Sequence, residues 1–121
     1  MSQDAGRLPD YLEHIVQAID RITRYTTGLG AQQFLASDMV QDAVIRNLEV
    51  VGEASRNIQR HHPSFAAAHP ELPLVFAYEM RNALAHGYFK IDLQVVWNTL
   101  QEDLPRLRSQ AHQALTGLRK P

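Results

Sequence analysis

An arginine, an asparagine, a histidine and a tyrosine lie within eight residues of one another, in the segment Arg81-Asn82-Ala83-Leu84-Ala85-His86-Gly87-Tyr88. On a helix of about 100° per residue, with Phe76 as the origin, Arg81 lies at about 140° and His86 at about 280°. The two side chains would then flank a groove whose floor is the small Ala85. Asn82 precedes His86 by four residues, so its amide is placed to orient the imidazole.

A guanidinium and an imidazole are the groups needed to cleave RNA through its own 2′-hydroxyl. The imidazole of His86 would take the hydroxyl proton or protonate the leaving 5′-oxygen. The guanidinium of Arg81 would stabilise the charge that builds on phosphorus, and no metal ion is required. The spacing alone leaves a structural alternative open, in which His86 interacts with the helix dipole and Arg81 pairs with a surface acid.

The histidines do not have the spacing of a metal site. No two of them are four residues apart on a predicted helix, and no HExxH motif occurs. The chain also lacks a glycine-rich phosphate loop and a GxSxG motif. We therefore expect neither a metal site nor a cofactor. The six histidines are His14, His61, His62, His69, His86 and His112.

The hydrophobic periodicity predicts four main helices and no strand, and hence an all-α bundle with antiparallel neighbours. The helices are expected at about 11–27, 39–60 and 74–86 and after residue 92, with a loop at 61–73. Asp10, Asp38 and Asp92 are the expected N-caps. Gly52 costs about 1 kcal/mol in mid-helix, which favours close approach by another helix there. Pro105 predicts a kink in the last helix.

Each predicted helix has a stripe of apolar residues that would face the core. In the third helix the stripe leaves Arg81 and His86 outside the core. On the second helix, five charged residues occupy the other side, which is expected to be a solvated face with ion pairs. The third-helix core residues are Phe76, Met80, Ala83 and Leu84, and the charged residues are Arg46, Glu49, Glu53, Arg56 and Arg60.

Length and composition fit one domain, expected over residues 1–121. The chain has no cysteine, no long apolar run and no apolar stretch at its N-terminus, so we expect a cytoplasmic protein without a membrane segment. The net charge is −1, from 12 basic and 13 acidic residues, so binding to RNA would need a local basic patch.

The motif Arg81-Asn82-x3-His86-x-Tyr88 resembles the Arg-x4-His-x-Tyr motif of the HEPN superfamily, and in particular the HepT-like toxins of HepT/MntA toxin–antitoxin systems. The segments 41–54, 69–73, 80–89 and 96–105 are also similar to that family, so the resemblance covers nearly the whole chain. It implies an up-and-down helical bundle that forms a homodimer, with the two motifs facing one cleft.

The resemblance also implies a metal-independent endoribonuclease with Arg81 and His86 as the catalytic pair and Asn82 in support. The implied partner is a minimal nucleotidyltransferase antitoxin that transfers AMP from ATP to Tyr88 and so silences the toxin. Two alternatives remain: a non-catalytic subunit that binds nucleotide or RNA beside a nucleotidyltransferase, and a helical adaptor that only dimerises.

Overall fold

The structure is a computed structural model that describes residues 7–86 and 92–119, with Ala85 and His86 described by their backbone alone. All regular secondary structure in these two ranges is helical, which confirms the predicted all-α class. No helix among them combines the length and apolar character needed to cross a membrane.

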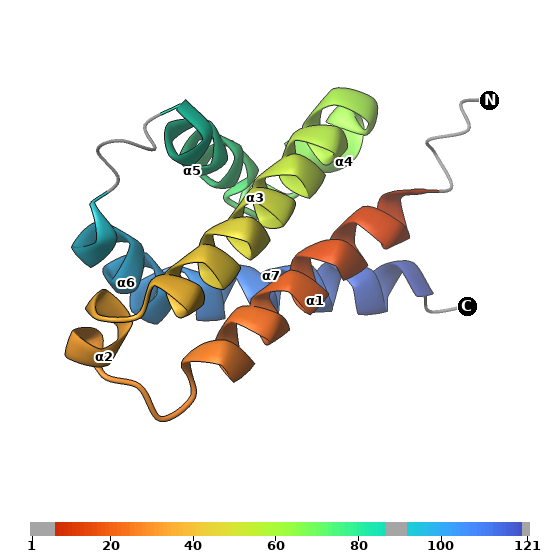
Figure 1. Ribbon diagram of the computed structural model, residues 1–121. Helices are drawn as coiled ribbons and strands as arrows, with labels where there is room; N and C mark the ends of the chain where they lie inside the picture. The colour runs from red at the N-terminus through yellow and green to blue at the C-terminus, as the bar shows by residue number, and fades with distance from the viewer. Residues whose placement is uncertain (1–6, 87–91, 120–121) are drawn as a thin grey trace.

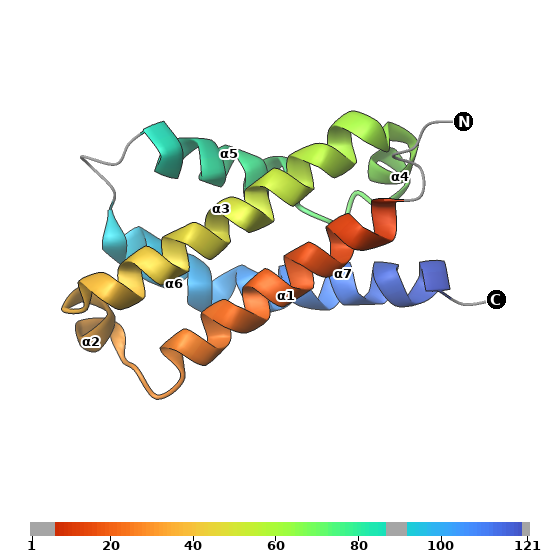
Figure 2. The ribbon, with the colours of Figure 1, turned by 45° about the vertical axis from the view of Figure 1, so that its right-hand side comes forward.

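Four long segments form the bundle: α1 (Leu8–Thr26), α3 (Asp38–His61), α5 (Leu74–His86) and the pair α6 (Leu93–Glu102) with α7 (Leu104–Arg119). Helix α3 lies between α1 and α5, and α1 also packs against α7. Figure 2 shows that each long segment runs opposite to the one before it. The predicted up-and-down arrangement is therefore confirmed within the described residues.

Two short helices, α2 (Ala31–Leu35) and α4 (Pro63–Ala68), lie outside the predicted helices, and α4 lies within the predicted loop at 61–73. Pro63 opens α4 at the first helical position, where a missing N–H is tolerated, so a proline in a loop segment did not exclude a helix. The predicted last helix is two helices rather than one kinked helix. Pro105 is the second residue of α7, where it breaks no intrahelical bond, and the chain changes helix at Asp103.

The predicted N-caps are right at one helix of three. The Asp92 carboxylate accepts the backbone N–H groups of Gln94 and Val95, as expected. Helix α1 begins at Leu8, before Asp10, because Pro9 favours the first turn. Helix α3 is capped by Ser37, whose hydroxyl accepts the Val40 N–H, so the cap lies one residue earlier than Asp38.

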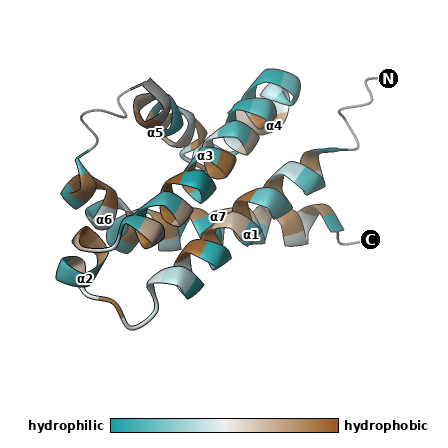
Figure 3. Ribbon diagram, viewed as in Figure 1, coloured by the Kyte–Doolittle hydropathy of each residue, from teal (hydrophilic) through white to brown (hydrophobic). Residues whose placement is uncertain are grey.

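The core is formed mainly by the predicted stripes of α1 and α3, and Figure 3 shows hydrophobic and hydrophilic residues interspersed along both helices. Phe34 of the unpredicted helix α2 is fully buried beside Trp97. Gln41 is also buried, and its amide donates to the backbone carbonyls of Phe34 and Leu35, which fixes α2 against α3. The sequence predicts nine residues in the stripes of these two helices; Val40 is partly buried, and the other eight are fully buried or nearly so, namely Leu12, Ile15, Ile19, Ile22, Val44, Leu48, Val51 and Ile58.

The predicted core face of α5 is partly wrong. Phe76 is 45% exposed and Ala83 is also exposed, whereas Ala77 is fully buried. The helix is apolar around most of its circumference, so periodicity alone did not identify the buried side. Ala77 lies against Gly52 of α3 and Leu84 is buried, whereas Phe76 is left on the outer surface.

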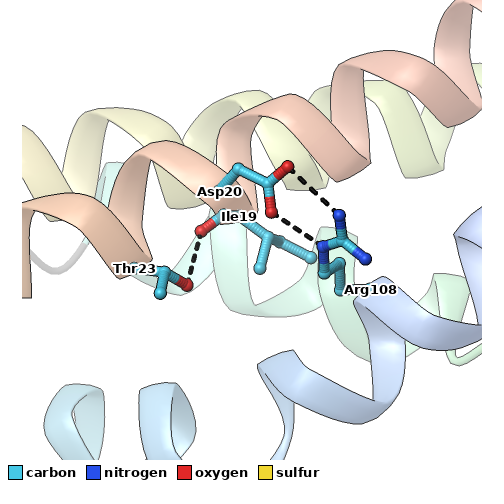
Figure 4. Close-up of polar contacts among 4 residues, drawn as sticks. All are labelled: Ile19, Asp20, Thr23 and Arg108. Carbon is cyan, nitrogen blue, oxygen red and sulfur yellow. Dashed lines mark hydrogen bonds and ion pairs between the residues drawn. The ribbon is translucent and has the colours of Figure 1, made fainter. Parts of the chain in front are cut away.

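An ion pair joins α1 to α7 on the far side of the bundle from α5. The Arg108 guanidinium donates to both carboxylate oxygens of Asp20, at 2.7 and 3.3 Å (Figure 4). The hydrogen bond to Asp20 raises the pKa of Arg108 above its usual value, with partial burial opposing the shift and the charge of Asp20 adding to it. Both side chains are well exposed, so this pair contributes little to the free energy of unfolding.

Candidate active site at the contact of helices α3 and α5

Gly52 of α3 is the point at which α5 comes closest. A Cβ placed on Gly52 would overlap the Cβ of Arg81 and would lie 3.0 Å from the carbonyl oxygen of Ala77. The predicted close approach at this glycine is therefore confirmed. The Cβ and Cγ of Arg81 occupy the space that a side chain at position 52 would need, so the glycine allows Arg81 to pack directly against α3.

The guanidinium of Arg81 is held from two sides. Its Nη2 lies 3.4 Å from a carboxylate oxygen of Glu53, the residue that follows Gly52. Its Nη1 donates to the Oδ1 of Asn82 at 3.1 Å. The side chain is 29% exposed, and a guanidinium has five N–H donors, so the fork keeps further donors for a bound anion.

Arg81 forms one wall of a hollow of about 340 Å³ that extends over the outer face of α3 toward α1. His14 of α1 and Arg46 of α3 also line this hollow, and both are exposed. The sequence did not point to His14 or Glu53 as neighbours of the motif. His14 is 67 residues from Arg81 along the chain, so only the packing of α1 and α5 against α3 brings them together.

Of the other motif residues, Asn82 is described in full and His86 by its backbone alone. The Oδ1 of Asn82 accepts a hydrogen bond from Arg81, while the predicted contact of Asn82 with the imidazole of His86 lies outside the described residues. Helix α5 ends at His86, as predicted, so the backbone of this residue is one turn beyond Arg81 and Asn82. The side chain of His86 and all of Tyr88 lie outside the described residues, so their predicted roles stay predictions.

The described part of the chain has no group of three or more His, Asp or Glu side chains placed to hold a metal ion. Two carboxylates, those of Glu49 and Glu53, line the hollow beside Arg81, and that of Glu53 is paired with the Arg81 guanidinium. The described part of the site is thus one arginine near the end of α5, paired with Glu53 and hydrogen-bonded to Asn82.

Comparison with known proteins identifies the family of this chain. The family model described as "Ribonuclease HepT-like" matches residues 15–114. A protein of Thermococcus cleftensis named "Probable ribonuclease HepT" is 43% identical over 99 residues, which cover 82% of this chain and 87% of that protein. A Methanocaldococcus jannaschii protein named "Putative RNase MJ1380" is 32% identical over 100 residues, covering 83% and 89%.

The matched region contains α3, α5 and the whole 81–88 segment. No solved structure matches the chain significantly. Since the family model covers well over half of the residues, its match establishes the family directly. The chain belongs to the HepT-like ribonuclease family.

Proposed function

We propose that this chain is an endoribonuclease that cleaves RNA without a metal ion, with Arg81 and His86 as its catalytic residues and Asn82 as a positioning residue. The observation that carries the proposal is the placement of Arg81, whose Cβ and Cγ pack against Gly52 and whose guanidinium lies between Glu53 and Asn82. It lies one turn before His86 in a chain of a ribonuclease family. The site belongs to a single domain spanning the chain, which acts in the cytoplasm.

The proposed reaction is a substitution at phosphorus with two proton transfers, one from the attacking 2′-hydroxyl and one to the leaving 5′-oxygen. A base removes the proton of the 2′-hydroxyl, and the oxygen attacks the adjacent phosphorus. The bond from phosphorus to the 5′-oxygen breaks, and this oxygen takes a proton from an acid. An imidazole serves either role near neutral pH, so His86 fits both. Arg81 stabilises the extra negative charge on the phosphoryl oxygens through its two-pronged hydrogen bonding.

The test of this function is cleavage of single-stranded RNA by the purified chain in excess EDTA. We expect cleavage at the same rate with and without EDTA, because the 2′-hydroxyl supplies the nucleophile and the proposed residues supply the proton transfers. An oligonucleotide of the same sequence made of DNA should remain intact. Loss of RNA cleavage in EDTA, with recovery on adding Mg²⁺, would contradict the proposal.

We also propose that two copies pair so that their motifs share one cleft. The apolar outer side of α5 supports this, since Val75 and Phe76 are 44% and 45% exposed on the helix that ends at His86. A two-fold axis beside α5 would bring two copies of Arg81 together and double the local positive charge. Light scattering at micromolar concentration should give twice the mass of one chain, and a monomer would contradict the pairing.

The proposed regulation is transfer of AMP from ATP to Tyr88 by a minimal nucleotidyltransferase antitoxin. The phenol oxygen would attack the α-phosphate of ATP, and pyrophosphate would leave. The proposal is supported by the family and by the place of Tyr88 two residues after His86, beyond Gly87. The added phosphodiester would occupy the RNA path and attract Arg81 away from the scissile phosphate.

Replacing Tyr88 by phenylalanine should leave RNA cleavage intact and abolish neutralisation through AMP transfer, because the ring stays and the acceptor oxygen is lost. Co-expression with the cognate nucleotidyltransferase, followed by mass spectrometry of the 81–90 peptide, measures the modification. Tyr25→Phe, at an exposed tyrosine of α1, is the matched control and should still be silenced. AMP found on another residue in the wild-type chain would refute the role of Tyr88.

A further inference from the structure

A second hollow, of about 360 Å³, lies between α3 and α5 beside the candidate active site. It is lined by Arg56, Gln59 and Arg60 of α3 and by Tyr78 and Asn82 of α5. No carboxylate is among these residues. The hollow therefore has a formal charge of +2 and a polar lining, which suits a polyanion better than an apolar partner.

The two arginines are free of acidic partners within the described residues. Arg56 and Arg60 are four residues apart, so they lie on the same side of α3, and both are exposed. Glu53 precedes Arg56 by one turn, but its carboxylate is paired with Arg81. The ion pairs of this region thus leave the charge of Arg56 and Arg60 uncompensated.

Asn82 connects this hollow to the candidate active site. Its side chain lines the hollow, and its Oδ1 accepts the hydrogen bond from Nη1 of Arg81. A strand bound along the hollow would therefore reach the Arg81 guanidinium directly after passing Asn82. Both arginines lie on the α3 side of this path, where their planar forks match phosphate oxygens.

We propose that Arg56 and Arg60 form a binding site for the sugar–phosphate backbone of RNA, next to the phosphate that Arg81 holds during cleavage. This inference rests on the proposed ribonuclease function and adds where the substrate strand runs. The site binds phosphates rather than bases, so it contributes affinity without sequence preference. It also explains how a chain of net charge −1 holds RNA.

The experiment measures binding of a single-stranded RNA in which every 2′-oxygen is methylated, because this strand lacks the attacking hydroxyl. Fluorescence anisotropy over a series of salt concentrations compares the wild-type chain with Arg56→Gln/Arg60→Gln. Two lost phosphate contacts should reduce the slope of log affinity against log salt by about 1.4, at about 0.7 per contact on a single strand. Affinity at low salt should fall at least about tenfold.

Arg24→Gln/Arg106→Gln is the matched control, since it removes the same charge from two exposed arginines that do not line the hollow. Its slope of log affinity against log salt should differ from that of the wild-type chain by less than about 0.7, the value for one phosphate contact. In cleavage of unmodified RNA, the Arg56/Arg60 variant should show a raised KM and an unchanged kcat, because neither residue touches the reacting atoms. Circular dichroism checks that each variant is folded.

An unchanged salt slope in the Arg56/Arg60 variant would overturn the inference. So would a slope that falls equally in the control, since that result would show only an effect of overall charge. If the variant keeps its RNA affinity but loses binding to the nucleotidyltransferase, the hollow is a protein-docking surface and the inference is wrong. The methylated strand cannot be cleaved, so the binding measurement does not depend on catalysis. It can therefore support or contradict the binding site even if the proposed catalytic roles are wrong.

Discussion

Replacing His86 by alanine should lower the rate of RNA cleavage by about 10²–10⁴-fold, the usual contribution of a general acid or base. Replacing Arg81 by alanine should lower it by about 10²–10³-fold, because the developing charge on phosphorus loses its partner. Arg81→Lys keeps the charge but loses the planar fork, so its rate should lie between those of the wild-type chain and Arg81→Ala. Single-turnover cleavage of a labelled RNA measures these rates.

Two exposed residues of α7 supply matched controls for this pair. His112→Ala and Arg106→Ala remove the same side-chain types from a helix away from the α3–α5 contact, and both should cleave at the wild-type rate. The substitution at Arg81 should also leave the thermal midpoint nearly unchanged, since alanine retains the Cβ that packs on Gly52. Wild-type cleavage by a folded His86→Ala chain would end the catalytic assignment.

Gly52→Ala should reduce RNA cleavage by up to about 100-fold, although Gly52 is not proposed to touch RNA. The added methyl group overlaps Arg81 Cβ and crowds the Ala77 carbonyl, so α5 must move away from α3. A displacement of about 1 Å in a catalytic group is enough for a loss of this size. Overpacking costs about 1–3 kcal/mol, and helix propensity returns only about 1 kcal/mol, so the variant should be less stable than the wild-type chain, and its cleavage is measured where circular dichroism shows it folded.

Gly117→Ala separates the two effects. Gly117 is also a helical glycine, but a Cβ there meets nothing within 4 Å. This variant should gain up to about 1 kcal/mol in the free energy of unfolding and should keep full cleavage. If Gly52→Ala also cleaves RNA at the wild-type rate, the close packing of Arg81 against Gly52 has no part in catalysis.

The sequence predicted the parts of the fold that depend on regular periodicity. Helices α1 and α3 are strongly amphipathic, and all their predicted core residues are buried except Val40, which is partly buried. Helix α5 is apolar on both sides, so the same method placed Phe76 in the core although it is exposed. Helix α2 is only five residues long and is held through Phe34 and Gln41, contacts that no local pattern encodes.

For the candidate site, the sequence predicts which residues are neighbours on one helix, but not which residues of different helices meet. Arg81 and Asn82 are neighbours on one helix, and Gly52 was expected to admit a close helix. That Arg81 is the group filling this contact, with Glu53 as its ion-pair partner, depends on the register of α5 against α3. The charged side of α3 was predicted as a solvated face with internal ion pairs, whereas the described pairing of Glu53 is with α5.

The ends of the RNA products test the central claim most directly. The purified chain is incubated with a short RNA of defined sequence in EDTA, and the fragments are weighed by mass spectrometry. Attack by the 2′-hydroxyl predicts a 2′,3′-cyclic phosphate on one fragment and a 5′-hydroxyl on the other, with neither fragment formed by His86→Ala. Fragments ending in a 3′-hydroxyl and a 5′-phosphate, or an RNA left intact by the folded wild-type chain, would contradict the account.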